Sequence, residues 1–405
     1  MAGVFLARQR RNKMELYQHQ QKLVDQNPSR HLIAFGTGCG KTLTVIALVQ
    51  KNGVKPLIIC PKGIKTQWQK QVPSDWLVVT KEELRRDWNK LPRRVAIIVD
   101  ESHAFANLKS QMSKALIAYC RKHQVQYRWL LTATPVTRDA NSIYALATHL
   151  GYQWNWYKFH HTFFSDVRMG ARLVPVAKSG LEKKLIQTIK SIGTVAKLED
   201  LIDLPPQTFE VEYFDQTPEQ ERAIKELTET DYIARFTRTH TVENGFYYAN
   251  EYELANKVYP CAKTNRVVEL CTDNDKIIIV CRYNAQIEYY KEVLKSLKKP
   301  IFIINGQTKN RHQVIQEADI APEAIILAQS ETMEGWQMRS IRIMVFASLS
   351  FKYLAFTQAV GRISRIDNPQ PNYYLTLLTQ GDADEAIHNA ISKKQDFYIQ
   401  LNANL

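Results

Sequence analysis

The stretch HLIAFGTGCGKTLTVIALVQ, residues 31–50, joins three kinds of sequence in an informative order. An apolar run leads into a glycine-rich turn, and a helix-favouring segment follows. A strand, a glycine-rich loop and a helix in this order present backbone N–H groups that bind phosphate. The side chain of Lys41 then reaches the β- and γ-phosphates, and the Thr42 hydroxyl ligates Mg²⁺. We predict a phosphate-binding loop made of Gly36, Thr37, Gly38, Cys39, Gly40, Lys41 and Thr42.

The strict form of this loop begins with a glycine at the position of Phe35, so the match departs there by one residue. Cys39 lies within the loop, at a helix N-terminus and near Lys41, which are conditions that lower a thiol pKa. We therefore expect an alkylating reagent to block the loop and a bound nucleotide to protect it.

Short apolar runs alternate with amphipathic segments twice along the chain. Strands that are apolar on both faces belong in parallel sheets covered by helices. The runs are residues 31–36, 56–60, 95–100 and 129–134 in the first half, then 276–281, 301–306, 323–328, 341–348 and 373–379. The fold class is therefore α/β with two parallel-sheet lobes in tandem. We expect a first lobe over residues 1–150 and a second lobe over residues 261–405.

Between the lobes, residues 151–260 break the alternation, and we expect helical insertions and a linker there. The tandem prolines of LIDLPPQ, residues 201–207, favour a linker because proline resists both helix and central strand. Thr217, Pro218 and Gln220 have the spacing of a capped helix start. The aromatic stretch at residues 152–164 either packs as a small core or stacks on bases, and the core is the favoured interpretation.

The composition indicates a globular protein with a polyanionic partner. Lys and Arg outnumber Asp and Glu by 54 to 40, which gives a net charge of +14. Such an excess favours nucleic acid. No apolar run reaches the length of a transmembrane helix, and the apolar patch at the N-terminus is too short for a signal peptide, so we expect a cytoplasmic protein without a membrane partner. The six cysteines have no metal-ligand spacing.

Two further motifs suit a phosphate loop. VAIIVDESH places Asp100 at the end of an apolar strand, where it can hold Mg²⁺, and puts Glu101 beside it to deprotonate an attacking water. LTATP, residues 131–135, ends another apolar run. Alone it is a common kind of turn. In this order along the chain, the three motifs indicate nucleotide hydrolysis.

Taken together, the motifs resemble those of superfamily-two helicases and translocases, in particular the Swi/Snf-type branch. The resemblance rests on YQHQ (17–20), GTGCGKT (36–42), PLIICPKGIKTQWQK (56–70), DESH (100–103), LTATP (131–135), EGWQM (334–338) and QAVGRISRI (358–366). It implies two RecA-like lobes that use ATP and Mg²⁺. At the last motif, Gly361 and Ser364 stand where this branch usually has Asp and His, which is closer to the superfamily at large.

The resemblance also implies roles for single residues. Gln18 corresponds to the glutamine that reads adenine, and Gly335 to a motif that touches both nucleotide and nucleic acid. Arg362 and Arg365 correspond to arginine fingers for the γ-phosphate, and Gln358 to a link toward His103. If residues 357–367 are helical, Gln358, Arg362 and Arg365 share one face.

Residues of two motifs are expected to contact nucleic acid. The resemblance places Lys62, Lys65 and Thr66 along the phosphate backbone, and Thr134 of LTATP nearby. Further positive potential comes from Arg85, Arg86, Lys90, Arg93, Arg94, Lys291, Lys295, Lys298 and Lys299. Charge runs on helices are usually solvated faces, so these residues act collectively and make binding sensitive to salt.

The resemblance implies an ATPase that translocates on duplex or branched DNA, acting as a monomer. Two alternatives remain open at this point: a helicase that separates strands of DNA or RNA, and a nucleic-acid binding module that uses ATP as a switch. The motifs fill the chain, as we expect of a minimal motor encoded by a phage or mobile element. A motor from such a source would work in the host cytoplasm.

Overall fold

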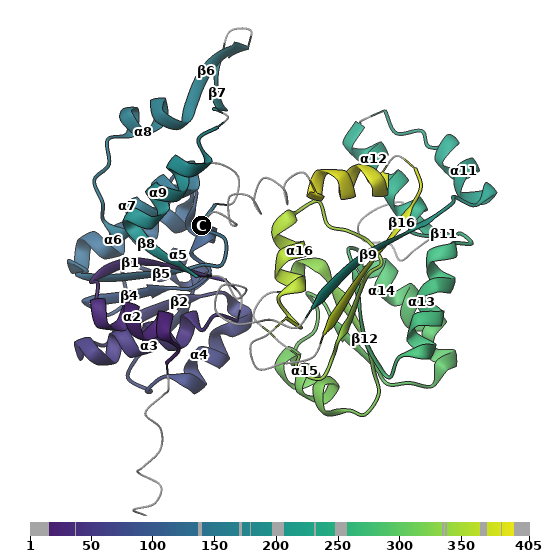
Figure 1. The fold of residues 1–405 in the computed structure, drawn as a ribbon, viewed down its shortest axis with the longest axis horizontal. Helices are drawn as coiled ribbons and strands as arrows, with labels where there is room; N and C mark the ends of the chain where they lie inside the picture. The colour runs from purple at the N-terminus through teal and green to yellow at the C-terminus, as the bar shows by residue number, and fades with distance from the viewer. Residues whose placement is uncertain are drawn as a thin grey trace, which may run out of the picture. The chain divides into compact units, whose positions relative to one another are not determined.

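The computed structural model describes two compact α/β units. The described residues are 16–36, 38–136, 140–169, 172–178, 180–196, 206–230, 232–247, 257–333, 336, 338–364, 371–381 and 383–392. The units comprise Met1–Leu201 and Ile202–Leu405 (Figure 1). Each unit is built around a six-stranded sheet in which every neighbouring pair of strands is parallel. The predicted fold class of two parallel-sheet lobes is therefore confirmed.

The first sheet has the strand order β3-β2-β4-β5-β1-β8. Its strands are β1 (Arg30–Phe35), β2 (Pro56–Cys60), β3 (Leu77–Thr80), β4 (Ala96–Val99), β5 (Tyr127–Leu131) and β8 (Gly193–Ala196). All residues of β2 and β4 are buried, as expected for strands that are covered on both faces. β1 lies between β5 and β8, so the loop after β1 starts at the edge of the sheet where the other carboxyl ends meet.

Helices connect these strands. They are α2 (Gln18–Gln26), α3 (Lys41–Asn52), α4 (Lys65–Gln71), α5 (Lys81–Asp87), α6 (Gln111–His123), α7 (Asn141–Leu150), α8 (Trp156–Phe163) and α9 (Glu182–Ile192). Local sequence sets several of their ends. Thr80 caps α5 by accepting from the N–H of Glu83, and the Glu83 carboxylate accepts the N–H of Thr80 in return. A separate hairpin joins β6 (Phe164–Met169) to β7 (Arg172–Ala177).

The second sheet has the strand order β13-β14-β12-β15-β16-β9. Its strands are β9 (Gln207–Phe214), β12 (Lys276–Cys281), β13 (Ile301–Ile304), β14 (Ala324–Gln329), β15 (Ile343–Phe346) and β16 (Asn372–Thr379). The helices of this unit are α11 (Pro218–Lys225), α12 (Tyr232–Glu243), α13 (Ala262–Asp273), α14 (Asn284–Leu294), α15 (Arg311–Ile320) and α16 (Tyr353–Val360). Residues 383–392 are also helical, and β10 (Phe246–Tyr247) pairs with β11 (Lys257–Val258).

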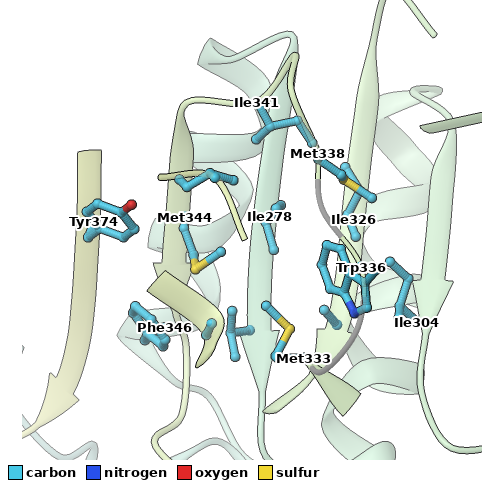
Figure 2. Close-up of a cluster of buried hydrophobic side chains, with 14 of the residues drawn as sticks. Ile278, Ile304, Ile326, Met333, Trp336, Met338, Ile341, Met344, Phe346 and Tyr374 are labelled. Carbon is cyan, nitrogen blue, oxygen red and sulfur yellow. The ribbon is translucent and has the colours of Figure 1, made fainter. Parts of the chain in front are cut away.

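Alternate residues of the second sheet pack against different helices. Ile277 and Ile279 of β12 belong to a core cluster that includes Ile287 and Leu294 of α14. Ile278 belongs to the opposite cluster, which is drawn in Figure 2. That cluster also contains Ile326, Met344, Phe346 and Tyr374 from neighbouring strands, together with Met333, Trp336, Met338 and Ile341 from the segment between β14 and β15. Met333, Trp336, Met338 and Ile341 are thus held against the sheet by their own side chains.

The stretch 151–260, expected as helical insertions and a linker, is shared between the two units. It contains α8, α9, α11 and α12, but it also supplies an edge strand to each sheet, β8 to the first and β9 to the second. The boundary between the units falls at Leu201, where LIDLPPQ begins; residues 201–205 of that segment lie outside the described residues. The predicted capped start of α11 is confirmed, with Thr217 as N-cap and Pro218 in the first turn.

In the part of the chain that the structure describes, no helix is both long enough and apolar enough to cross a membrane.

Candidate functional site

The phosphate-binding loop follows β1 and ends at α3, as its sequence predicted. Gly38 and Gly40 have positive φ angles of 82° and 78°. This left-handed backbone disfavours residues with a Cβ atom. At Gly40 a Cβ atom would lie only 1.9 Å from Nε2 of Gln20. Glycine is therefore required at this position for two reasons, backbone conformation and close packing.

Lys41 is the first residue of α3, and its ammonium group binds the loop itself. Its Nζ donates to the carbonyl oxygens of Phe35 at 2.9 Å and Gly36 at 3.2 Å. The side chain therefore curls over the loop, toward the end of β1. A phosphate that entered the loop would offer the ammonium a charged acceptor, and hydrogen bonds between two charged groups are stronger than those to carbonyls. Thr37 lies outside the described residues.

The residue that holds this loop from α2 is Gln20. Gln20 is fully buried, and its Nε2 donates to the Gly40 carbonyl at 3.1 Å. Its Oε1 accepts the N–H of Tyr17 at 2.8 Å, and Nε2 of His19 lies 3.0 Å from the Cys39 carbonyl oxygen. Gln18, predicted to bind adenine, is exposed. Sequence reasoning missed Gln20, although its position three residues after Tyr17 is that of a capping box.

Two carboxylates follow β4, as the sequence predicted. Asp100 accepts the indole N–H of Trp68 at 2.9 Å on one oxygen and the backbone N–H of Glu101 at 2.9 Å on the other. Burial, helped by the charge of Glu101, raises the pKa of Asp100 to about 6, while Trp68 and the charge of Lys41 oppose the shift. The influence of Lys41 shows that the loop and the end of β4 lie within electrostatic reach of each other.

Glu101 has a φ angle of 49°, in the left-handed region that residues with a side chain rarely occupy. Such strained positions cluster at functional sites. Its Oε2 lies 3.2 Å from Nδ1 of His103, and the same nitrogen lies 3.4 Å from Oγ1 of Thr132. Thr132 Oγ1 also accepts the backbone N–H of Thr134 at 3.0 Å. The DESH and LTATP motifs are thus connected through His103.

These residues suit a magnesium–nucleotide complex. Burial and, after it, the charge of Glu101 raise the pKa of Asp100, and a divalent cation would stabilise both carboxylates in their charged form. The loop offers glycine backbone and one lysine to phosphates. Carboxylate and hydroxyl oxygens are the protein ligands that Mg²⁺ accepts alongside phosphate. The donor set therefore fits the group that the sequence predicted.

In the second unit, Arg362 is buried, with 6% of its surface exposed. Its Nε donates to the Gln358 carbonyl at 2.7 Å and its Nη1 to the Trp336 carbonyl at 2.7 Å. Arg362 thereby ties α16 to the segment between β14 and β15. The condition that residues 357–367 are helical is not met as far as Arg362: α16 ends at Val360, with Gly361 as C-cap, and Arg362 lies in the turn that follows. Glycine is a poor helix former and favours an end there.

Gln358 lies within α16 and is half-buried. Arg365 and Gly335 lie outside the described residues. The predicted finger and nucleotide-contact roles of these three residues therefore stay predictions.

The residues expected to contact nucleic acid differ in how available they are. Lys62, in the turn before α4, and Thr66, in the first turn of α4, are exposed. Lys65 is engaged in an ion pair with Glu83 at 2.7 Å. Thr134 is half-buried in the loop after β5. Their contacts with nucleic acid stay predictions.

Several lysines and arginines of the predicted basic clusters have partners on their own surface. Lys291 and Lys295 pair with Glu288 and Glu292 of the same helix. Lys299 donates to the last carbonyls of α13, at Cys271, Thr272 and Asn274. In the first unit, Arg85, Arg86, Lys90 and Arg93 are exposed. Arg86 and Lys90 also pair with Asp87, at 2.7 Å and 3.7 Å, so basic residues in both units have ion-pair partners.

The structure bears on two further predictions made from the sequence. The Cys39 thiol is fully buried, which argues against its predicted reactivity toward alkylating reagents. In the aromatic stretch, Phe159, Phe163 and Phe164 are buried, as a core would be, but Trp156 and Tyr157 are 40% and 74% exposed. The favoured core interpretation therefore accounts for the phenylalanines and for Trp156, whose ring centre lies 4.8 Å from that of Tyr144, but not for Tyr157.

Comparison with known families assigns most of the chain. Residues 75–251 match the SNF2-related domain, and residues 262–367 match the helicase conserved C-terminal domain. The two matches follow each other in the order that the motifs predicted; the first begins in the first unit and extends past its boundary at Leu201, and the second lies in the second unit. The matched sequences come from fungi and bacteria and do not bear on the expected origin in a phage.

Three individual proteins illustrate the similarity. DNA repair protein rad5 of Emericella nidulans is 30% identical over 132 residues, which cover 32% of this chain and 10% of that protein. The uncharacterized ATP-dependent helicase YqhH of Bacillus subtilis is 20% identical, and the alignment covers 92% of this chain and 76% of that protein. The solved SWI2/SNF2 ATPase core of Sulfolobus solfataricus in complex with dsDNA covers 97% of this chain, with 17% identity and a TM-score of 0.41.

Proposed function

Because the chain belongs to the SNF2-related, helicase-like ATPases, we propose that it hydrolyses ATP to drive its movement along duplex or branched DNA. The observation that carries the proposal is the cluster of Lys41, Asp100, Glu101 and His103 at the carboxyl edge of one parallel sheet. A lysine, two carboxylates and a histidine are side chains of the types that nucleotide hydrolysis uses. The net charge of +14 supports a nucleic-acid partner.

The binding half of this site consists of Lys41, Thr42 and Asp100. Lys41 leaves the carbonyls of Phe35 and Gly36 to bind the β- and γ-phosphates. Thr42 and Asp100 would hold Mg²⁺, which neutralises phosphate charge when it is bound. The hydrogen bonds from the Trp68 indole and the Glu101 backbone N–H fix the orientation of the Asp100 carboxylate, and each oxygen keeps acceptor capacity for the metal. Gln18, exposed at the start of α2, remains the residue proposed to read adenine.

The catalytic half of the site centres on Glu101. Its carboxylate accepts a proton from the attacking water, and His103 holds that carboxylate through the contact at 3.2 Å. Arg362 and Arg365, with Gln358, are proposed from the family resemblance to stabilise the γ-phosphate charge. Because they belong to the second unit, hydrolysis then depends on movement of the units, which is how ATP turnover would drive translocation.

Nucleic acid is proposed to bind the exposed Lys62 and Thr66, with Lys65 joining after its ion pair with Glu83 opens. The charge of these contacts implies an affinity that falls with salt concentration. We further propose that the motor acts as a monomer and that the cytoplasm is its location.

The test is steady-state ATP hydrolysis by the purified chain alone and with duplex DNA, forked DNA, single-stranded DNA and RNA, each at two salt concentrations. Glu101→Gln is the matched control, because it keeps the size and polarity of the side chain while removing the base. We expect strong stimulation by duplex or forked DNA in the wild type and none in the variant.

Other outcomes would redirect the proposal. Stimulation by single strands or RNA alone would favour a strand-separating helicase, and displacement of an annealed strand would then be measured directly. If Glu101→Gln abolished hydrolysis but kept the activity on DNA, the protein would be an ATP-switched binding module instead.

A further inference from the structure

A two-stranded hairpin, made of β6 and β7, extends from the first unit beside α8 (Figure 1). Its strands pair with each other from Phe164↔Ala177 to Met169↔Arg172. Among the described residues these two strands form a sheet of their own, apart from the six-stranded sheet. A lone hairpin is marginally stable in water, so its base needs support and its exposed part calls for an explanation.

The base of the hairpin is held firmly against α8. Phe164 is 3% exposed and stacks on the His160 ring with 5.3 Å between ring centres. Nε2 of His160 lies 2.9 Å from Oδ1 of Asp166. On the other strand's side, the backbone N–H of Lys178 donates to the Phe163 carbonyl at 2.9 Å. These contacts anchor the hairpin at the end next to α8.

The hairpin has one exposed apolar face. Val167 is 45% exposed and Val176 is 46% exposed. Ser165 pairs with Val176, and Ser165 and Val167 are two residues apart on β6, so both valines lie on the same face. Nearby in the chain, α8 leaves Trp156 and Tyr157 exposed. Trp156 packs on the rings of Tyr144 and His160, with ring centres 4.8 Å and 5.4 Å away, so the side chains that still call for an explanation are Tyr157 and the two valines.

The charges of residues 156–178 indicate which kind of partner binds there. Residues 156–178 contain four basic residues, Lys158, Arg168, Arg172 and Lys178, against one acidic residue, Asp166. A polyanion complements this excess. Phosphates gain nothing from valine or from an aromatic face, whereas unpaired bases stack on aromatic rings and contact apolar side chains. A partner that offers both is nucleic acid with unpaired bases beside a backbone.

We propose that the β6–β7 hairpin and the exposed face of α8 bind the junction of forked DNA, where paired and unpaired segments meet. Tyr157 and the two valines contact the first unpaired bases, and Arg168 with Lys158 contacts the adjoining phosphates. This inference rests on the proposed function, because it assigns that motor a preference for branched over plain duplex DNA.

The test is equilibrium binding of the full chain, without nucleotide, to a fork and to a blunt duplex of equal length in nucleotides. The fork carries 2-aminopurine at the first unpaired position, because stacking on an aromatic ring changes its fluorescence. Tyr157→Ala and the double variant Val167→Ser/Val176→Ser test the hairpin. Ile320→Ser is the matched control, since Ile320 is 82% exposed on α15 in the second unit. Thermal unfolding checks that each variant folds.

We expect the wild type and Ile320→Ser to prefer the fork by about fivefold or more, the value of one stacked base. In the hairpin variants the ratio of fork affinity to duplex affinity falls toward one. The change in 2-aminopurine fluorescence on binding becomes smaller as well. An unchanged ratio in folded variants, an equal loss for fork and duplex, or a wild type without fork preference overturns the inference. Absence of DNA-stimulated ATP hydrolysis would instead overturn the proposed function, since the binding ratio is measured without ATP.

Discussion

Lys263 and Asp384 form an ion pair with Nζ and Oδ2 2.5 Å apart, although 121 residues separate them in the chain. Neither side chain is more than 1% exposed. The Lys263 ammonium also donates to Asn244 Oδ1 at 2.7 Å, and Asp384 accepts the backbone N–H of Thr379 at 2.9 Å. Burial alone would raise the pKa of Asp384, yet Lys263 and His240 hold that pKa well below its usual range. The pair joins α13 to the helix at residues 383–392.

Replacing one partner of this pair is expected to destabilise the second unit severely. Asp384→Asn leaves the Lys263 ammonium buried without its counter-charge, which lowers the free energy of unfolding by about 3–5 kcal/mol. Chemical denaturation followed by tryptophan fluorescence measures the change. The double variant Lys263→Met/Asp384→Leu removes both charges and is expected to be less destabilised than Asp384→Asn. A milder effect of the single variant than of the double would contradict this account.

The first unit is expected to lose stability in mild acid because of His149. Its side chain is 1% exposed, and burial lowers its pKa to about 4 despite the contact of Nε2 with the Phe105 carbonyl at 3.0 Å. Between pH 6.5 and 4 the unfolded chain binds the proton and the folded chain does not, so stability falls as pH falls. At pH 5 the loss from this group is about 2 kcal/mol.

The measurement is thermal unfolding of the wild type and His149→Gln at pH 7 and pH 5. The variant cannot titrate, so its midpoint is expected to shift less between the two pH values. His161→Gln, which changes an exposed histidine of the same unit, serves as control and should behave as the wild type does. Equal shifts in all three proteins would rule out His149 as the cause.

Gly40→Ala is expected to abolish tight nucleotide binding. The new Cβ atom meets Gln20 at 1.9 Å, and the φ angle of 78° is unfavourable for alanine, so the loop must rearrange. Gly53→Ala is the matched control, because Gly53 ends the same helix with a φ angle of 61° and nothing lies within 4 Å of its Cβ position. The control should lose about 1 kcal/mol of stability and keep its affinity. Binding of a fluorescent ATP analogue distinguishes the two.

Substitutions at Arg362 and at Arg365 are expected to have different effects on stability and on ATP hydrolysis. Arg362→Lys cannot bridge the Gln358 and Trp336 carbonyls with one ammonium group, so we expect a loss of about 1–3 kcal/mol in stability along with activity. Arg365→Ala is expected to lower ATP hydrolysis about a thousandfold without changing the unfolding midpoint. Parallel measurements of hydrolysis and thermal unfolding separate the two. A fully stable Arg362→Lys protein would contradict the positioning described for Arg362.

The parts of the fold that the sequence predicted are those where one local signal suffices. PLIIC is apolar throughout and KIIIVC is apolar after its first residue, Lys276, and both form strands with the predicted ends. The start of α11 was also predicted residue by residue, because its cap uses only neighbouring side chains. β8 and β9 were missed. GTVA is short, and QTFEVEYF alternates apolar and charged residues, so neither resembles a strand that is buried on both faces.

In the candidate site, too, local sequence signals predicted some features and contacts between distant segments determined the others. The loop, the two carboxylates and His103 follow from motifs that are continuous in sequence. The contacts of Gln20 with Gly40 and of Trp68 with Asp100 join segments about 20 and 32 residues apart, and only the folded chain brings them together. The burial of Arg362 depends likewise on the Trp336 carbonyl, 26 residues away. No spacing rule at residues 357–367 contains that information.

The pairing of β9 with β16 bears on how the protein is made. β9 is the first strand of the second unit to leave the ribosome, and its partner β16 is the last. That sheet cannot be completed until nearly the whole unit has been synthesised, and contacts between such distant segments form slowly. The first sheet closes through β8 and β1, both within residues 1–201. During translation, the first unit can thus fold before β16 is available to pair with β9. The unpaired edge of β9 is then the segment that a chaperone would need to shield.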